Sequence, residues 1–228
     1  MKKEEILKQL KEDILDEKGE ILNITEKGID YFDYGFSWDD HTIFFRYDDF
    51  CTKEELKKII FISDKSRKYG ITEEYIASIL VDAYSECFIE MMTTLRAIAI
   101  IHDIEEMEKV FEFANIANDD GVELENCVGL TVFDSQICVV NEGEILRMNS
   151  ELNDGYSGIE IYESGIGVTL IHECRHQMLD CNFLLSEKDF PISENSEDAV
   201  EEFARFKWDM IYDNHRLNSE FLYELNEI

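Results

Sequence analysis

Two histidines four residues apart constrain the fold of this chain more than any other feature. The segment His172-Glu173-Cys174-Arg175-His176 has the pattern H-E-x-x-H. On a helix, residues i and i+4 lie on the same face, about 6 Å apart along the axis. The apolar residues Val168, Leu170 and Ile171 come just before the motif and can bury the opposite face. The segment is therefore predicted to be helical, with both imidazoles on one side.

This arrangement of side chains is suited to a metal ion. Two imidazoles so placed can each put a nitrogen about 2.0–2.1 Å from one Zn²⁺. Glu173 adjoins a ligand and can reach a water on the metal without binding the metal itself. Zinc lowers the pKa of that water to around 7, and the carboxylate accepts its proton as the water attacks a carbonyl carbon. We therefore expect Glu173 to be a general base that then passes the proton to the leaving amine.

A catalytic zinc usually takes a third protein ligand, and an acidic helix downstream offers three candidates: Glu197, Glu201 and Glu202. We favour Glu197, which follows His176 after twenty residues and lies in the first turn of its helix. That spacing lets a loop return the chain to the metal. Glu201 lies one turn further on the same face and can instead orient a ligand histidine. Zinc is the expected ion, although a site of two histidines and one glutamate also accepts manganese or another divalent ion.

The motif and the downstream glutamate resemble the gluzincin branch of the zincin metallopeptidases. The pattern Glu197…Phe203-Ala204 is also similar to the E-x-x-A-N-x-F-A signature of ImmA/IrrE-type peptidases. Val200 and Glu201 stand where that signature has Ala and Asn. The resemblance covers about residues 156–208 and aligns Glu197 with the glutamate ligand of the family.

The resemblance implies an α+β, zincin-like fold and zinc-dependent hydrolysis of peptide bonds. The fold would contain a small mixed or antiparallel sheet, a backing helix, the motif helix and a C-terminal glutamate helix. One zinc per chain would be held by His172, His176 and Glu197. In zincins the strand nearest the site binds an extended substrate, and by that analogy residues 158–162 would be the substrate strand.

Periodicity along the rest of the chain agrees with this order of elements. One helix is expected over residues 2–16, and a second from a capping box at Thr52 and Glu55 to about Lys68. One or two backing helices are expected over residues 72–118. Strands are expected within residues 20–50 and over 128–133, 136–140 (extended by 145–148) and 158–162, with a turn at 118–121. The motif helix is expected to reach about Cys181, and a last helix to run from Asn195 or Ser196 past Trp208. We expect residues 1–120 to belong to the same domain as a catalytic core at 121–228.

Hydrolysis also needs a donor for the developing oxyanion. Five side chains near the motif or downstream of it are candidates: Tyr156, Tyr162, Arg175, Tyr212 and His215.

The charge of the chain limits its partners. With 52 acidic and 21 basic residues its formal net charge is −31, and such a surface repels nucleic acids and anionic membranes. A peptide or protein substrate and a basic protein partner remain compatible with it. Two alternative functions therefore stay open: a non-catalytic acidic interaction protein on a zincin fold, and a metal-dependent amidase or esterase for a small substrate.

Nothing in the sequence indicates export or membrane insertion. The residues after Met1 form no apolar run of the kind found in signal peptides, and no uncharged stretch approaches about 20 residues. We therefore expect a cytoplasmic protein whose six cysteines are reduced. The sequence does not indicate an oligomeric state.

Overall fold

The computed structural model describes residues 34–38, 41–45, 52–85, 87–116, 127–151, 158–180 and 196–217. The chain divides into two compact units, Met1–Glu55 and Leu56–Ile228. In the first, β1 (Tyr34–Trp38) and β2 (His41–Phe45) form an antiparallel hairpin, which confirms the strands predicted within residues 20–50. The helix predicted over residues 2–16 and the turn at 118–121 lie outside the described residues.

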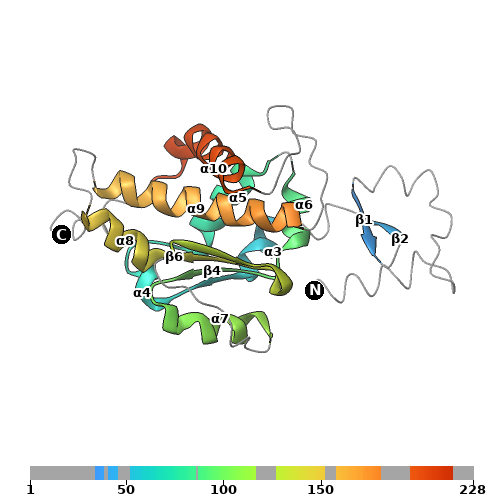
Figure 1. Cartoon of the computed structure of the whole chain (residues 1–228), viewed down its shortest axis with the longest axis horizontal. Helices are drawn as coiled ribbons and strands as arrows, with labels where there is room; N and C mark the ends of the chain where they lie inside the picture. Colours follow the sequence, from blue (N-terminus) through green and yellow to red (C-terminus); the bar gives the residue numbers. More distant parts are fainter. Residues whose placement is uncertain are drawn as a thin grey trace. The chain divides into compact units, whose positions relative to one another are not determined.

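The second unit is built on one mixed sheet of four strands in the order β3-β4-β6-β5 (Figure 1). The strands are β3 (Ile60–Ile62), β4 (Ala97–Ile101), β5 (Gly129–Val132) and β6 (Ile137–Asn141). β3, β4 and β6 are parallel, whereas β5 pairs antiparallel with β6 at the edge. The strands predicted at 128–133 and 136–140 and the α+β class are confirmed. Strands from both sides of residue 120 belong to this sheet.

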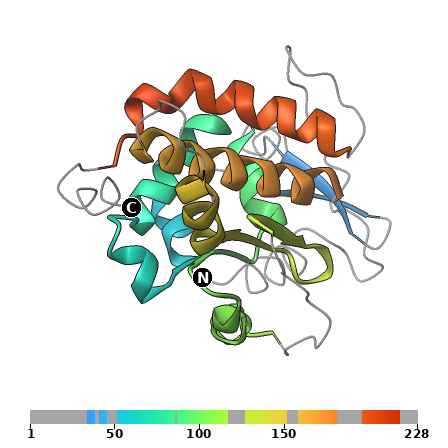
Figure 2. The same cartoon turned by 60° about the vertical axis from the view of Figure 1, so that its left-hand side comes forward.

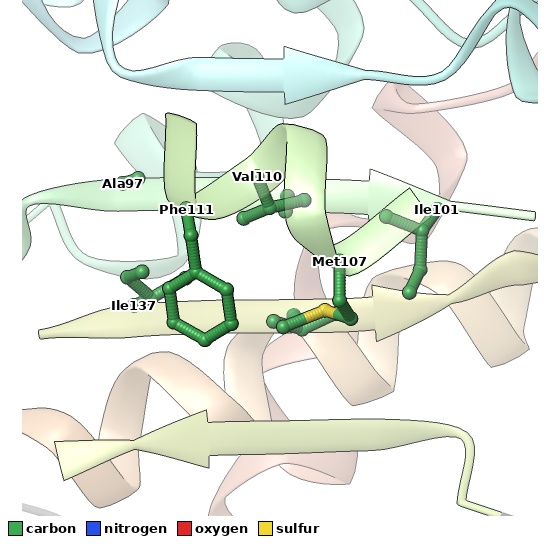
Figure 3. Close-up of a cluster of buried hydrophobic side chains, with 8 residues drawn as sticks. Ala97, Ile101, Met107, Val110, Phe111 and Ile137 are labelled. Atoms are coloured by element: carbon green, nitrogen blue, oxygen red, sulfur yellow. The ribbon is translucent and has the colours of Figure 1, made fainter. Parts of the chain in front are cut away.

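Helices cover both faces of the sheet. α7 (Met107–Ala114) packs against one face, while α9 (Gly158–Asp180) lies across β5 and β6 on the other, with α10 (Glu197–Ile211) stacked on α9 (Figures 1 and 2). Figure 3 shows the core under α7, where Phe111, Val110 and Met107 meet side chains of β4 and β6. Alternate residues of β4 and β6 face the opposite side, toward α9. The sheet therefore forms a central layer, and the motif helix packs directly on it.

The region predicted as one or two helices over residues 72–118 contains a strand. α5 (Glu73–Ala83) and α6 (Phe88–Thr94) are followed by β4, by the short 3₁₀ helix η1 (Ile104–Glu106) and by α7. All five residues of β4 are buried, because both faces of this central strand are covered by helices. Such a strand has a continuous apolar run rather than alternation, and in the absence of Gly or Pro it resembles a buried helix. The prediction of one or two helices over this region was therefore wrong at β4.

The helix predicted from Thr52 to about Lys68 is also interrupted. α3 (Lys53–Lys58) begins as predicted, with the Thr52 hydroxyl accepting a hydrogen bond of 3.2 Å from the backbone N–H of Glu55. β3 and α4 (Asp64–Arg67) follow, and Gly70 adopts a positive φ of 84° after α4. β3 has only three residues, too few for a strand pattern to stand out from helical spacing.

The predicted extension of β6 over residues 145–148 is wrong as well, because α8 (Glu142–Glu151) starts directly after the strand. The side chain of Asn141 explains the change of direction. Its Oδ1 accepts a hydrogen bond of 3.3 Å from the backbone N–H of Glu144, which caps the first turn of the helix.

The predicted substrate strand at residues 158–162 is instead the first part of α9, a helix of 23 residues. Tyr162, Ile166 and Leu170 are buried at helical spacing. Gly165 and Gly167 lie within this helix, where the absence of a side chain allows close packing. A Cβ at Gly165 would overlap the side chain of Ile145, and one at Gly167 would overlap the ring of Trp208.

The last predicted helix is confirmed as α10, which starts after Ser196 and is followed by the 3₁₀ helix η3 (Tyr212–Asn214). Within the described ranges, no helix is both long enough and apolar enough to cross a membrane.

Candidate metal centre

α9 places both motif histidines on one side, as the spacing predicted. The Nε2 atoms of His172 and His176 lie 2.9 Å apart, and their rings meet edge to face with centroids 4.6 Å apart. The opposite side of the helix is anchored in the protein, because Ile171 is fully buried and its carbonyl accepts a hydrogen bond of 2.6 Å from the Tyr84 hydroxyl. The two imidazoles are therefore held on a fixed helix.

α10 brings the glutamate to the histidines by packing closely on α9. The ring of Trp208 lies against Gly167, and its Nε1 donates a hydrogen bond of 3.1 Å to the Ser164 hydroxyl. Nearer the motif, Phe203 lies with its ring 4.1 Å from the guanidinium carbon of Arg175. These contacts fix the register of α10, so that its first residue, Glu197, lies beside the motif.

His172, His176 and Glu197 form the one group in the described part of the chain whose ligand atoms could hold a metal ion, all within 4.8 Å of one another. One carboxylate oxygen of Glu197 lies 3.2 Å from His172 Nε2, and the other lies 3.3 Å from His176 Nε2. Ligand atoms about 2.1 Å from a tetrahedral ion lie about 3.4 Å apart. Spacings of 2.9–3.3 Å are close to this value, so the three side chains fit a metal with little movement.

The charge state of His172 also suits a metal. Burial, and then the neighbouring His176, lower the pKa of His172. A lowered pKa favours the neutral imidazole, which is the form that binds metals. Glu197 is exposed over 82% of its side chain, so the group is accessible to solvent on that side.

Glu201 lies behind the group rather than in it. Its Oε2 is 3.3 Å from the buried Nδ1 of His172, which makes no hydrogen bond to any described residue. Its other oxygen accepts a hydrogen bond of 2.6 Å from Arg205 Nε. A small rotation would complete the carboxylate–histidine contact that commonly orients metal ligands. Glu202, the third candidate, is exposed and does not belong to the group.

The side chain of Glu173 packs against the sheet, and its carboxyl group lies close enough to His176 and Glu197 for both to act on its pKa. Its carboxylate is buried against β5, where Oε2 accepts a hydrogen bond of 2.6 Å from the Thr131 hydroxyl. A Cβ on Gly129 would overlap Oε1 of the same carboxylate. Burial raises the pKa of Glu173 to about 7, while the bond from Thr131 opposes the rise. A carboxyl group of this pKa next to the ligands can both accept and donate a proton near neutral pH.

Most of the predicted oxyanion donors are engaged elsewhere. The hydroxyl of Tyr162 donates to Glu142, that of Tyr212 donates to Glu163, and His215 pairs with Asp82. Arg175 is buried and packs on Phe203. Tyr156 lies outside the described residues. The structure therefore assigns none of these groups to the open side of the metal group.

Gly129 and Thr131 are the site residues that the sequence analysis missed. Residues 128–133 were predicted as a strand but given no role. A glycine inside a strand indicates that another group approaches the backbone closely. Gly129 was the only feature of the sequence that indicated the packing of the Glu173 carboxylate against this strand. Nothing comparable in the sequence distinguishes Thr131.

Comparison of the chain with protein-family models, with curated proteins and with solved structures found no match. A function must therefore be inferred from the side chains themselves. Their combination is specific: two imidazoles that face each other, an exposed carboxylate within reach of both, and a buried carboxyl group beside them.

Proposed function

We propose that this chain is a zinc-dependent metallopeptidase of the zincin type. The observation that carries the proposal is the convergence of His172, His176 and Glu197 from two helices, with Glu173 held next to them. Two imidazoles and one carboxylate are the donor set of many catalytic zinc sites. Manganese or another divalent ion is compatible with the same donors.

A metal at this group would supply Lewis-acid chemistry, making a water more acidic and polarising a substrate carbonyl. Glu173 does the proton work. Its carboxylate accepts a proton from the attacking water and then donates it to the amine of the broken peptide bond. After the small rotation described above, Glu201 would orient the ring of His172 through Nδ1. The open side of Glu197 leaves room for the substrate.

The edge of the sheet offers a place for the peptide. The backbone N–H of Asn141 donates to the Val128 carbonyl at 2.8 Å, so Val128 is hydrogen-bonded to β6. In an antiparallel pair every second residue is bonded in this way, so the backbone groups of Leu130 and Val132 also point toward β6. The N–H and C=O groups of Gly129 and Thr131 consequently point away from β6. Among the described residues β5 pairs with β6 alone. An extended peptide added to this edge would pass beside Glu173, so β5 takes the role expected earlier of residues 158–162.

The decisive experiment compares wild-type protein with Glu173→Gln. We expect hydrolysis of peptides by the zinc-loaded wild type, and a loss of roughly 10²–10⁴-fold in the variant with its zinc content unchanged. Hydrolysis of small amides or esters but not of peptides would instead identify an amidase or esterase. Equal activity of the two proteins would refute the proposed role of Glu173.

The net charge of −31 favours one competing function, an acidic protein that occupies a basic partner. Salt-sensitive binding to a basic protein that survives Glu173→Gln, in a chain without hydrolytic activity, would support it. We propose a cytoplasmic location, and the free cysteines Cys87, Cys127, Cys138 and Cys174 agree with a reducing compartment.

A further inference from the structure

The edge strand contributes more than a backbone template. We propose that Thr131 is a positioning residue that holds the Glu173 carboxylate in its working place. The inference rests on the proposed function for its catalytic consequence, whereas the contact itself is independent of it.

The Thr131 hydroxyl contacts two acceptors that belong to one residue. It lies 2.6 Å from Oε2 of Glu173 and 3.0 Å from the backbone carbonyl of Glu173. This carbonyl belongs to the backbone of α9, so its contact with the hydroxyl restrains the Thr131 side chain relative to the helix. Threonine is β-branched and stiff at χ1, and its side chain is buried. The position of the carboxylate is therefore tied to both the helix and the strand.

Gly129 makes this position available. It lies two residues before Thr131 on the same face of β5, and a Cβ there would overlap Glu173 Oε1 and the methyl group of Thr169. The absent side chain leaves a slot for one carboxylate oxygen while Thr131 bonds to the other. Without the hydroxyl, the flexible glutamate side chain would have other rotamers available to it.

The catalytic consequence follows from geometry. Proton transfer requires the base within hydrogen-bond reach of the water, and a displacement of about 1 Å can cost roughly 100-fold in rate. A residue that only positions the base should change kcat more than KM. It should also leave the metal in place, because Thr131 is not one of the three residues whose atoms could hold the ion.

The kinetic test uses full-length, zinc-loaded protein and the variants Thr131→Val and Thr131→Ser. We expect Thr131→Val to lower kcat by roughly 10–100-fold with KM within about twofold and zinc content unchanged. Serine retains the hydroxyl and should restore most of kcat. The matched control is Thr94→Val, which removes another buried hydroxyl, one that donates to the Met91 carbonyl at 2.9 Å. Unchanged kcat in Thr131→Val, or an equal loss in Thr131→Ser, would overturn the inference.

A second measurement separates this inference from the proposed function. In metal-free protein, a double-mutant cycle pairs Thr131→Val with Glu173→Ala and follows the unfolding equilibrium constant in urea. The measurement is made at about pH 8, above the pKa of about 7 of Glu173, so that the acceptor is charged. We expect the combined effect of the two changes on the unfolding equilibrium constant to differ by about tenfold from the product of their separate effects. In the control cycle of Thr131→Val with Glu197→Ala, the combined effect on the unfolding equilibrium constant should equal the product of the two separate effects. If Thr131→Val does not fold, Thr131→Ala replaces it.

The outcomes are distinct. An inactive wild type with coupling between residues 131 and 173 would refute the peptidase proposal and retain the positioning contact. A multiplicative cycle would overturn the positioning role whether or not the protein hydrolyses peptides.

Discussion

Glu173 is the buried carboxylate at the candidate metal centre, and its burial should make the stability of the metal-free protein depend on pH. Its pKa is raised from the ordinary 4.5 to about 7, mainly by desolvation. Between these two pH values the folded protein keeps a proton that the unfolded chain has lost. The free energy of unfolding therefore falls as the pH rises through this window, and the full loss is present above pH 7.

The size of the effect follows from the shift. The difference between 4.5 and about 7, at about 1.4 kcal/mol per pKa unit, corresponds to about 3 kcal/mol. Part of this loss is already present at pH 5, so about 2–3 kcal/mol remains between pH 5 and pH 8. Glutamine has nearly the same shape and no charge. Glu173→Gln should therefore remove the pH dependence that this residue causes.

The assay is urea unfolding in the presence of a chelator at about pH 5 and about pH 8. Relative to wild type, Glu173→Gln should gain about 2–3 kcal/mol of stability between the two pH values. Thr94→Val serves as the control, because it removes a buried hydroxyl and no titrating group. It should shift stability equally at both. If Glu173→Gln also shifts stability equally at the two pH values, the claim that burial raises the pKa of Glu173 is refuted.

Three further predictions concern the packing and side chains around the site and the core under α7. Gly167→Ala should push the Trp208 ring away and lower the free energy of unfolding by about 1–3 kcal/mol, as measured by urea unfolding. Zinc affinity, measured by titration, should fall as well if α10 carries a ligand. Glu201→Gln should weaken zinc binding by roughly 10–100-fold, whereas the exposed Glu202→Gln should leave the titration unchanged, and equal effects would contradict the assigned positions. Phe111→Ala should lower the free energy of unfolding, measured in urea, by about 3–5 kcal/mol. A loss of about 0.5 kcal/mol or less, as is usual for a surface residue, would place Phe111 outside the core.

The sequence predicted the parts of the site that depend on local geometry. The spacing of His172 and His176 determines their common face on any helix, and Glu197 begins a helix whose first turn is recognisable. The contact between that glutamate and the histidines depends on the packing of α10 against α9. Gly167 and Trp208, which make the packing close, lie well outside the motif, so spacing alone left Glu201 and Glu202 open.

The errors in the fold share one physical origin. β4 is buried on both faces, so its sequence Ala97–Ile101 lacks the alternation that identifies a strand. The opposite error occurred at residues 158–162, where alternating apolar residues suggested a strand. This segment is helical, and the nearby Gly165 and Gly167 admit Ile145 and Trp208 to the surface of the helix. Both cases were decided by contacts between segments distant in sequence.

The central claim is that His172, His176 and Glu197 hold one metal ion, and elemental analysis of the purified protein tests it most directly. We expect about one zinc per wild-type chain, and a large loss of zinc in His176→Ala and in Glu197→Ala. A crystal structure should then place the ion within about 2.2 Å of the three ligand atoms. A wild-type chain without stoichiometric metal, or variants that retain as much metal as wild type, would contradict the account.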